Sequence, residues 1–348
     1  MVNMTDYDKI CNFENLYRAH LKARLGKKHK LEVTSFETHL SMNLLSMAAL
    51  LRARTYQMQG YYHFTISEPK RREIFAAHYP DRVLLHCVCD NVLAPILQPR
   101  LIYDNVACQP GKGTHFALNR MTEFLRRHYI KHGAEGYILK CDIRKYFASI
   151  DQETLKKQLA RVVRDEDVCQ LLFHYIDSYN TDGRPGRGIP LGNQSSQWFA
   201  VFYLNPVDRL VKEKLRIKHY LRYMDDMVLV HHSKEYLQEC LRQIRALCDA
   251  LGLELNEKTQ IFPLRAGVDF LGWHFYLTES GKIVRKLRRG TKTRYKRRLR
   301  RLESDYGNHL VDEADVKMIL ASYHGHFKHG HAYRLQAHTL RDFTLVRR

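Results

Sequence analysis

The sequence predicts a mixed α+β fold, because patterns typical of helices and of strands both occur along its 348 residues. Apolar side chains recur at steps of three and four residues over 36–51 and 237–251, as in amphipathic helices. The runs 137–143 and 221–230 are short and mostly apolar or aromatic, which favours strands. Both strand-like runs carry aspartates, so we expect a sheet that presents carboxylates.

The run 221–230 places two adjacent carboxylates, Asp225 and Asp226, between apolar flanks. Asp-Asp suits the bend between two strands, and buried carboxylates are costly unless they meet a metal ion or hydrogen-bond donors. Hard cations such as Mg²⁺ take oxygen ligands and keep positions for phosphate oxygens. An ordinary exposed turn is the alternative, because Asp is common in turns.

A third carboxylate, Asp142, lies near the end of the strand-like run 137–143. Two strands of one sheet can bring it beside Asp225. Three carboxylates around two metal ions suit in-line nucleotidyl transfer, in which one ion activates the attacking hydroxyl and the other holds the leaving phosphates. A strand-end acid that caps a turn is the alternative for Asp142.

Five motifs in a fixed order give these acids a context. Tyr223-Met224-Asp225-Asp226 resembles the catalytic motif of reverse transcriptases, and Asp142 with Phe147 five residues later resembles their first catalytic motif. The segments 189–197, 251–258 and 270–273 resemble three further motifs of the family. The resemblance implies a right-hand polymerase with fingers, a palm containing an antiparallel sheet, and a helical thumb. The expected divisions are 1–90 (fingers), 91–150 (first part of the palm), 151–188 (return to the fingers), 189–276 (second part of the palm) and 277–348 (basic helical thumb).

A variant motif narrows the resemblance. Leu191-Gly192 followed by Ser196-Gln197 is similar to the reverse transcriptases of diversity-generating retroelements, within the group II intron and retron-like bacterial enzymes. The segments 68–70, 110–115 and 267–272 share this similarity. That group implies error-prone, adenine-mutagenised cDNA copied from a template-repeat RNA. Leu191 cannot form the hydrogen bond that Gln gives relatives near the nascent base pair, so we expect it to hold that pair less tightly.

Two alternatives to this reading stay open. A retron or group II intron-like reverse transcriptase is the close one. A catalytically inactive RNA-binding protein with a polymerase fold is the alternative from a different class, although all three acids are present.

The resemblance assigns roles to individual residues. Asp142 and Asp225 would bridge two Mg²⁺ ions, for which Mn²⁺ can substitute, with Asp226 and the carbonyl of Ile143 in support. Phe147 would stack beneath the deoxyribose and exclude a 2′-hydroxyl. The other expected contacts to the deoxynucleoside triphosphate are Lys70, Arg72, Leu191, Gly192 and Lys258, and the expected contacts to primer or template are Tyr223, Met224, Leu271, Gly272 and Trp273. An ordinary surface position is the alternative for Lys258.

The net charge of +20 indicates a polyanionic partner, most plausibly nucleic acid. No apolar run is long enough to span a membrane and no signal peptide is present, so we expect no membrane contact and a location in the cytoplasm of a bacterial or phage-infected cell. The eight cysteines form no Cys-x-x-Cys pair, which favours reduced cysteines over zinc or disulfides. The histidines of 324–331 lack the partners of a zinc site.

Further elements follow from local patterns. We expect a strand over 61–66, a helix over 83–97 broken by Pro95, helices within 151–179, a helix over 197–210 and a hairpin over 267–276. Residues 109–114 miss the spacing of a phosphate-binding P-loop and instead form a glycine turn, with Thr114 capping the next helix. Residues 282–301 contain 12 Lys or Arg and no acid, with Tyr295, Leu299, Leu302 and Tyr306 on one helical face.

The resemblance also implies partners. We expect template RNA, the RNA/cDNA duplex, deoxynucleoside triphosphates and a small ring-forming helical accessory protein. We expect no protease, RNase H, integrase or endonuclease module after the thumb, which makes the enzyme dependent on such partners.

Overall fold

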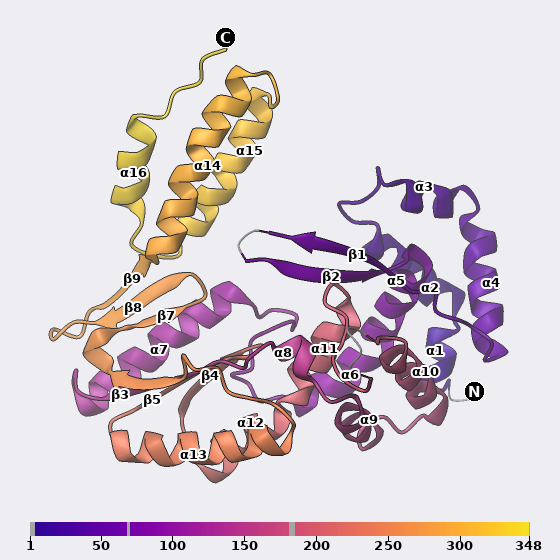
Figure 1. Cartoon of the computed structure of the whole chain (residues 1–348), viewed down its shortest axis with the longest axis horizontal. Coiled ribbons are helices and arrows are strands. Elements are labelled where there is room, and N and C mark those ends of the chain that lie inside the picture. Colours follow the sequence, from indigo (N-terminus) through magenta and orange to yellow (C-terminus); the bar gives the residue numbers. More distant parts are fainter. Residues whose placement is uncertain (1–3, 68–69, 181–184, 348) are drawn as a thin grey trace.

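Three antiparallel sheets organise the computed structural model, which describes residues 4–67, 70–180 and 185–347. A two-stranded ribbon, a four-stranded sheet in the order β4-β5-β3-β6 and a three-stranded sheet β7-β8-β9 follow one another across the molecule (Figure 1). The strands are β1 (Tyr61–Ile66), β2 (Arg72–Ala77), β3 (Tyr137–Cys141), β4 (His219–Tyr223), β5 (Asp226–His231), β6 (Gln260–Pro263), β7 (Val268–Phe270), β8 (Trp273–Leu277) and β9 (Ile283–Leu287).

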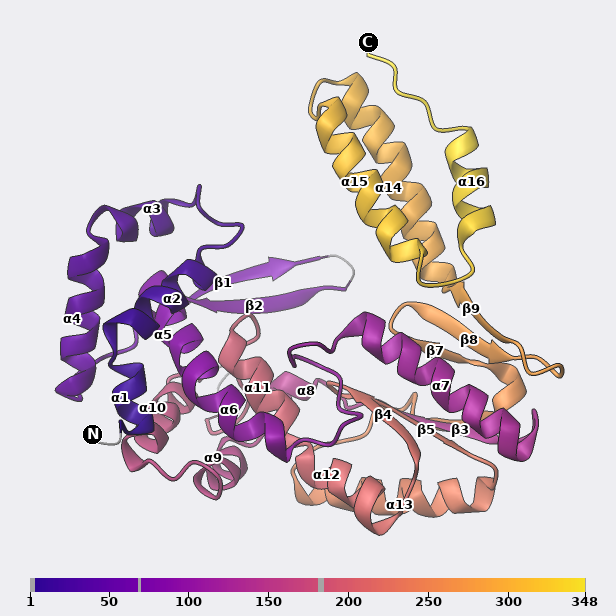
Figure 2. The same ribbon diagram turned by 180° about the vertical axis from the view of Figure 1, so that it is seen from behind.

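Helices gather at the two ends of the molecule and on the central sheet, as Figure 2 shows from behind. The first group is α1 (Asp6–Ile10), α2 (Phe13–Ala23), α3 (Leu31–Thr38), α4 (Leu40–Arg52), α5 (Tyr79–Val88), the π-helical turn η1 (Cys89–Leu93), α6 (Ala94–Leu97) and the 3-10 turn η2 (Gln98–Arg100). Next along the chain come α7 (Thr114–His132), α8 (Tyr146–Ser149), α9 (Gln152–Ala160), α10 (Glu166–Asp177), α11 (Gln194–Tyr203), α12 (Asn205–Arg209), the π-helical turn η3 (Leu210–Lys214), α13 (Lys234–Ala250) and the 3-10 turn η4 (Leu264–Ala266). Of these, α9 and α10 lie at the end of the molecule that contains α1 (Figures 1 and 2). The last is α14 (Arg289–Gly307), α15 (Glu313–Phe327) and α16 (Tyr333–Arg341).

The apolar stripe over 36–51 lies on two helices rather than on the single helix that its spacing predicts. His39 leaves the helical region, with φ −126° and ψ 41°, and separates α3 from α4. The side chain of Asn43 donates to the carbonyl of Phe36 at 2.9 Å, which satisfies a backbone acceptor at the end of α3. The stripe is buried on both helices all the same.

Three other local expectations differ from the structure. Pro95 does not break the helical stretch over 79–97, because the chain widens into the π-turn η1 just before it. Proline has no N–H to donate, and the wider turn accommodates the carbonyl that would otherwise accept that hydrogen bond. Gly113, with φ 133°, takes the position that caps α7, and Thr114 is the first helical residue. The predicted helix over 197–210 is interrupted at Leu204, where α11 ends and α12 begins.

The central sheet is covered on both faces, with α7 on one side and α13 on the other (Figures 1 and 2). Its strands alternate accordingly. Leu139, Cys141 and Leu229 belong to the same core as α13, whereas Ile138 and Val230 belong to the core that contains α7. Side chains two residues apart on a strand share a face. Asp142, which follows β3, is therefore on the α7 face with Ile138.

The ribbon of β1 and β2 gains a third segment from the loop before α11. The amide N–H of Phe75 donates to the carbonyl of Leu191 at 2.9 Å. The buried side chain of Asn193 accepts from the N–H of Ala77 and donates to the carbonyl of Phe75. These bonds fix the ribbon to residues 191–193, which lie between it and the central sheet.

The C-terminal helices attach through the three-stranded sheet. Residues 283–287 form β9, so the predicted basic helix over 282–301 begins at Arg289. Tyr295, Leu299 and Leu302 are buried on one face of α14, as the spacing predicts. Gly330, after α15, lies directly on Trp273, because a Cβ at this glycine would be 2.1 Å from the indole ring. No helix in the described ranges has the length and apolar character needed to cross a bilayer.

Candidate active site

The two aspartates of 225–226 lie at the hairpin between β4 and β5, but only one is in the bend. Tyr223 pairs with Asp226 across the two strands, which leaves Met224 and Asp225 as a two-residue turn. Met224 has φ 55°, a left-handed conformation that is strained for a residue with a branched or long side chain. Asp226 opens β5 instead of sharing the turn, and its side chain is therefore fixed by the sheet.

The sheet brings Asp142 to the same place. Cys141 pairs with Met227 in the β3–β5 register, so the next residue of the first strand, Asp142, lies beside Asp226. A short bridge between Ile143 and Leu255 fixes the backbone beyond β3. It uses the carbonyl of Asp142, which accepts from the N–H of Asn256 at 2.7 Å, and leaves the carbonyl of Ile143 outside this pairing.

Burial, followed by the crowding of carboxylates, sets the electrostatics of this site. Burial, reinforced by the nearby charge of Asp142 and then of Asp226, raises the pKa of Asp225 to about 6. The guanidinium of Arg72, on β2, opposes that rise. Burial also raises the pKa of Asp226, while the ammonium of Lys140 opposes the shift. The three acids therefore act on one another electrostatically, and Arg72 faces them from the ribbon.

The donor set fits a divalent cation. Oδ1 of Asp226 is buried without a hydrogen-bond partner, and neighbouring carboxylates that repel one another are relieved by a cation with oxygen ligands. Oδ2 of Asp226 is bonded to Nζ of Lys140 at 3.2 Å. Within the described residues, no three Asp, Glu, His or Cys side chains are arranged to hold one ion together. Oδ1 of Asp226, whose residue lies beside Asp142 in the sheet, is therefore left available to a cation.

A buried ion pair supports the turn from behind. Arg222 and Asp208 are both fully buried, and the guanidinium donates to both carboxylate oxygens, at 2.7 and 2.6 Å. The same guanidinium donates to the carbonyl of Met224 at 2.8 Å and to that of Val201 at 2.8 Å. Tyr220 donates to Asp208 as well, at 2.7 Å. The left-handed Met224 is therefore held by a side chain two residues before it.

Sequence reasoning did not single out Arg222, Asp208, Lys140 or Asn193. One signal could have found the first and third: a charged residue inside a strand that is otherwise apolar must have a partner if it is buried. The partner of Arg222, Asp208, lies in a helical segment and gives no such signal.

Two residues expected at the nucleotide site, Phe147 and Gly192, are fixed by contacts with neighbouring segments. Phe147 is partly buried in α8, and its carbonyl accepts from the N–H of Ile189 at 3.0 Å, which ties it to the loop of Leu191 and Gly192. Gly192 has φ 127°, and a Cβ there would be 2.8 Å from the side chain of Ile74. A larger residue at 192 would push against β2, so glycine is required by both conformation and space.

Other predicted site residues lie at the edges of this region. Lys258 is exposed, in a loop whose Asn256 binds both the N–H of Lys258 and the carbonyl of Asp142. Leu271 and Gly272, with φ 47° and 87°, form the half-buried turn between β7 and β8. Trp273 is fully buried under Gly330, so its side chain packs inside the protein. Lys70 lies in the turn of the ribbon, whereas Glu68 and Pro69 lie outside the described residues.

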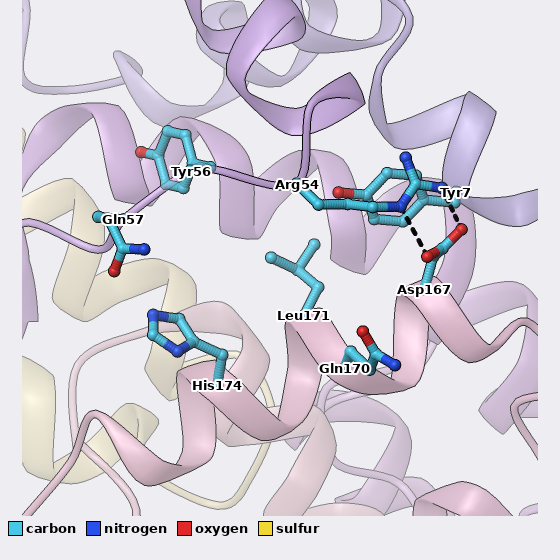
Figure 3. A pocket seen from close by; sticks show the side chains of 8 residues that line it. All are labelled: Tyr7, Arg54, Tyr56, Gln57, Asp167, Gln170, Leu171 and His174. Atoms are coloured by element: carbon cyan, nitrogen blue, oxygen red, sulfur yellow. Dashed lines mark hydrogen bonds and ion pairs between the residues drawn. The ribbon is translucent and has the colours of Figure 1, made fainter.

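A separate cavity of about 200 Å³ lies between α1, the segment after α4, and α10 (Figure 3). Arg54 and Asp167 form an ion pair across it, and the guanidinium lies 4.6 Å from the ring centroid of Tyr7. None of the predicted site residues lines this cavity. It is therefore distinct from the carboxylate site.

Comparison with known families decides the identity of the fold. The sequence profile described as reverse transcriptase (RNA-dependent DNA polymerase) matches residues 79–275, more than half of the chain and all three carboxylates. The chain belongs to the reverse transcriptase family. The matched segment of this reverse transcriptase begins at α5 and ends in β8, so it contains the central sheet and the loop of Leu191. No curated protein matches the sequence.

Solved telomerase structures are similar to part of this reverse transcriptase. Apo telomerase from Candida tropicalis aligns with a TM-score of 0.50 and 14% identity, covering 66% of this chain and 49% of the telomerase chain. A form of the same telomerase truncated from its C-terminal domain gives 0.49 and 15%, covering 71% and 60%. Telomerase from Candida albicans in complex with a TWJ fragment of telomeric RNA gives 0.49 and 12%, covering 73% and 50%. The chain thus spans half to three fifths of the length of these proteins.

The raised pKa of Asp225 has a consequence for stability. The folded chain holds this proton more tightly than the unfolded chain, so the stability that it contributes is complete below the ordinary aspartate value of 3.8 and is lost as pH rises through about 6. Asp225→Asn, which stays neutral, should therefore raise the free energy of unfolding at pH 7.5 without divalent cations by about 1–3 kcal/mol. Urea unfolding at pH 7.5 and pH 4 measures this, with the exposed Asp249→Asn as control. A gain of equal size at both pH values would contradict the assignment.

Proposed function

We propose that this chain is an RNA-directed DNA polymerase that adds deoxynucleotides to the 3′-hydroxyl of a primer and releases pyrophosphate. The observation that carries the proposal is the meeting of Asp142 and Asp225, from β3 and the β4–β5 turn, in a chain of the reverse transcriptase family. Their mutual repulsion, seen in the raised pKa of Asp225, is the state that a cation-dependent phosphoryl-transfer site has before its ions bind.

Two divalent cations, Mg²⁺ or Mn²⁺, would supply activation of the attacking hydroxyl and charge neutralisation on the leaving phosphates. Asp142 and Asp225 would hold them, with the carbonyl of Ile143, and Asp226 would contribute its unpartnered Oδ1. The protein's own part is to keep these oxygens fixed before substrate arrives, which lowers the cost of reorganisation.

The side chains around the acids suit a nucleoside triphosphate. Arg72 faces Asp225 from the ribbon and, with Lys70, is placed to bind phosphate oxygens. Phe147, held beneath the Leu191 loop, would lie against the deoxyribose and exclude a 2′-hydroxyl. Gly192 would allow the backbone to approach the nucleotide. The backbone of Lys258 is joined to that of Asp142 through Asn256, and we propose its exposed ammonium as the acid for the leaving pyrophosphate.

The basic helix α14 suits the nucleic-acid duplex. Its buried face is apolar, and the opposite face carries arginines and lysines that no acid within 282–301 neutralises. It rises from the three-stranded sheet, apart from the helices α1–α6 (Figure 1). We propose that 1–90 with 151–188 act as fingers, 91–150 with 189–276 as palm, and 277–348 as thumb, and that RNA and the RNA/cDNA duplex bind between fingers and thumb through phosphate contacts.

Primer extension tests the proposal. The full chain should extend a DNA primer on an RNA template with Mg²⁺ and deoxynucleotides, and Asp225→Ala should lower the rate at least about 1,000-fold, because a charged group at the reacting centre is lost. The exposed acid variant Asp249→Ala is the matched control and should extend normally. Extension by Asp225→Ala at the wild-type rate would refute the assignment of the site.

The motif variant at Leu191 supports a narrower proposal, that the product is error-prone cDNA of a diversity-generating retroelement. The carbonyl of Leu191 is bonded to the ribbon, so its apolar side chain is held in a fixed place. We propose that it faces the nascent base pair without offering a hydrogen bond. A template-repeat RNA and a small ring-forming helical protein would be the partners, in the cytoplasm of a bacterial or phage-infected cell. A retron or group II intron-like enzyme is the second candidate.

Sequencing the products of Leu191→Gln separates these candidates. The added amide should hydrogen-bond near the base pair and lower misincorporation opposite template adenine by about 3- to 10-fold, equivalent to roughly one hydrogen bond. Leu191→Met, which stays apolar, is the control and should keep the wild-type error pattern. Wild-type products without excess errors opposite adenine would favour the retron or group II intron-like candidate.

A further inference from the structure

Lys140 is a charged residue in the interior strand β3 of the central sheet. It lies two residues before Asp142, so both side chains are on the α7 face, and it pairs with Val228 across β3 and β5. The side chain is about one quarter exposed. The ammonium donates to Oδ2 of Asp226 at 3.2 Å and also to the backbone carbonyl of Asp269 on β7. One lysine therefore joins the carboxylate site to the next sheet.

The β7 end of this link continues to the base of α14. The carboxylate of Asp269 accepts from His274 Nδ1 at 2.8 Å and from Arg288 Nε at 2.9 Å. The backbone N–H of Arg288 donates to the carbonyl of Gly272 at 3.1 Å. Gly272 belongs to the half-buried β7–β8 turn, and Arg288 is the last residue before α14. The connection thus runs from Asp226 through Lys140 and Asp269 to this turn and to the C-terminal helices.

The ion pair with Lys140 distinguishes Asp226 from the other two acids. Asp226 has one oxygen on Lys140 and the other buried without a partner, so a cation can use only the second without breaking the ion pair. Asp142 and Asp225 have no such cationic partner in any hydrogen bond or ion pair of the described residues. A positive charge beside the site also weakens its attraction for a second cation.

We propose that Lys140 is a positioning residue that couples the metal site to the β7–β8 turn, so that metal binding and duplex binding strengthen each other. The proposal rests on the proposed function, because the turn is taken to hold the primer. Asp226 then serves as the mechanical link between the metal site and the primer end. A simple structural ion pair would stabilise the sheet and leave the two binding events independent.

Two binding measurements on the full chain test this without turnover. Mn²⁺ binding is followed by the loss of the free-ion electron paramagnetic resonance signal, and duplex binding by fluorescence anisotropy of an RNA/DNA primer–template with a dideoxy 3′ end. The dideoxy end removes the 3′-hydroxyl, so direct contact between that hydroxyl and the ion cannot produce coupling. Coupling is reciprocal, so the change in duplex affinity caused by Mn²⁺ must equal the change in Mn²⁺ affinity caused by duplex.

In the wild type, Mn²⁺ should tighten duplex binding about 5-fold or more. Lys140→Met should bind Mn²⁺ several-fold more tightly in the absence of duplex, because a positive charge beside the acids is removed, and should lose most of the coupling. Lys140→Arg should keep the coupling, since it can donate to both acceptors. Lys234→Met, an exposed lysine at the start of α13, should match the wild type in both measurements.

Arg288→Met provides a second route, because it weakens the same link at its far end and its guanidinium acts on Asp226 through charge alone, without a hydrogen bond. It should lower the coupling while changing Mn²⁺ affinity without duplex less than Lys140→Met does. Wild-type coupling in both Lys140→Met and Arg288→Met would overturn the proposal. Failure of the proposed function has a different signature: neither Mn²⁺ nor duplex would bind the wild type in an Asp225-dependent manner.

Discussion

The buried ion pair of Arg222 and Asp208 is the constraint on which the site depends. Both side chains are inaccessible to solvent, and the guanidinium also binds the carbonyl of Met224. Burying such a pair gives little net stability, because the cost of removing two charges from water offsets their attraction. Its contribution here is geometric. It holds a non-glycine residue in a left-handed turn, and that turn keeps Asp225 close enough to Asp142 for the two charges to interact.

The rest of the sheet follows from this anchor. Asp208 comes from α12, whereas Arg222 is on β4, so the pair attaches α12 to the strand that enters the turn. Asn105 adds a third element, since its amide donates to Asp208 at 3.2 Å and its backbone bridges to Arg222. The ion pair and this bridge hold the edge strand β4, and helices α7 and α13 cover the two faces of the sheet.

The acids themselves work against the fold. Burial and mutual repulsion raise the pKa of Asp225, so at neutral pH its ionised form destabilises the protein in the absence of cations. The ammonium of Lys140 opposes the rise in the pKa of Asp226, and the guanidinium of Arg72 opposes the rise in the pKa of Asp225. A site that binds cations must be left short of positive charge, and the strained turn adds to this cost. The packed sheet around it supplies the compensating stability.

Much of this arrangement could be predicted from the sequence. The motif order located Asp142 and the turn of 223–226, and apolar periodicity located α13 and the buried face of α14 correctly. Prediction failed where long-range contacts decide local structure. The break at His39 interrupts an apolar stripe that looks continuous, whereas the π-turn η1 lets the chain stay helical through Pro95, where the sequence predicts a break. Arg222 looked like part of a strand flank, because its partner lies in a distant segment and carries no pattern.

Thr114 and Asp226 show that residue preferences predict the position of a cap or a turn only to within one residue. Each lies one residue away from the structural position that its residue type favours, since Gly113 caps α7 and Met224 takes the first position of the turn. Residue preferences are too weak to fix such boundaries when the neighbouring residue has more conformational freedom or a stronger anchor. Lys140 could have been suspected from its place inside a strand, but its link to Asp269 depends on how two sheets meet.

Arg222 holds the backbone of the turn at Met224 in addition to its effect on stability. The most direct test compares Arg222→Met alone with Arg222→Met combined with Asp208→Asn, which removes both buried charges and keeps an acceptor for Tyr220. The single variant should lose about 3–5 kcal/mol of stability, because an unpaired carboxylate stays buried, and the double variant should recover most of it. The double variant should be folded and yet extend a primer at least about 100-fold more slowly than wild type. The reason is that Met224 has lost the hydrogen bond from Arg222, so Asp225 is misplaced. A double variant that is folded and extends primers at the wild-type rate would contradict it.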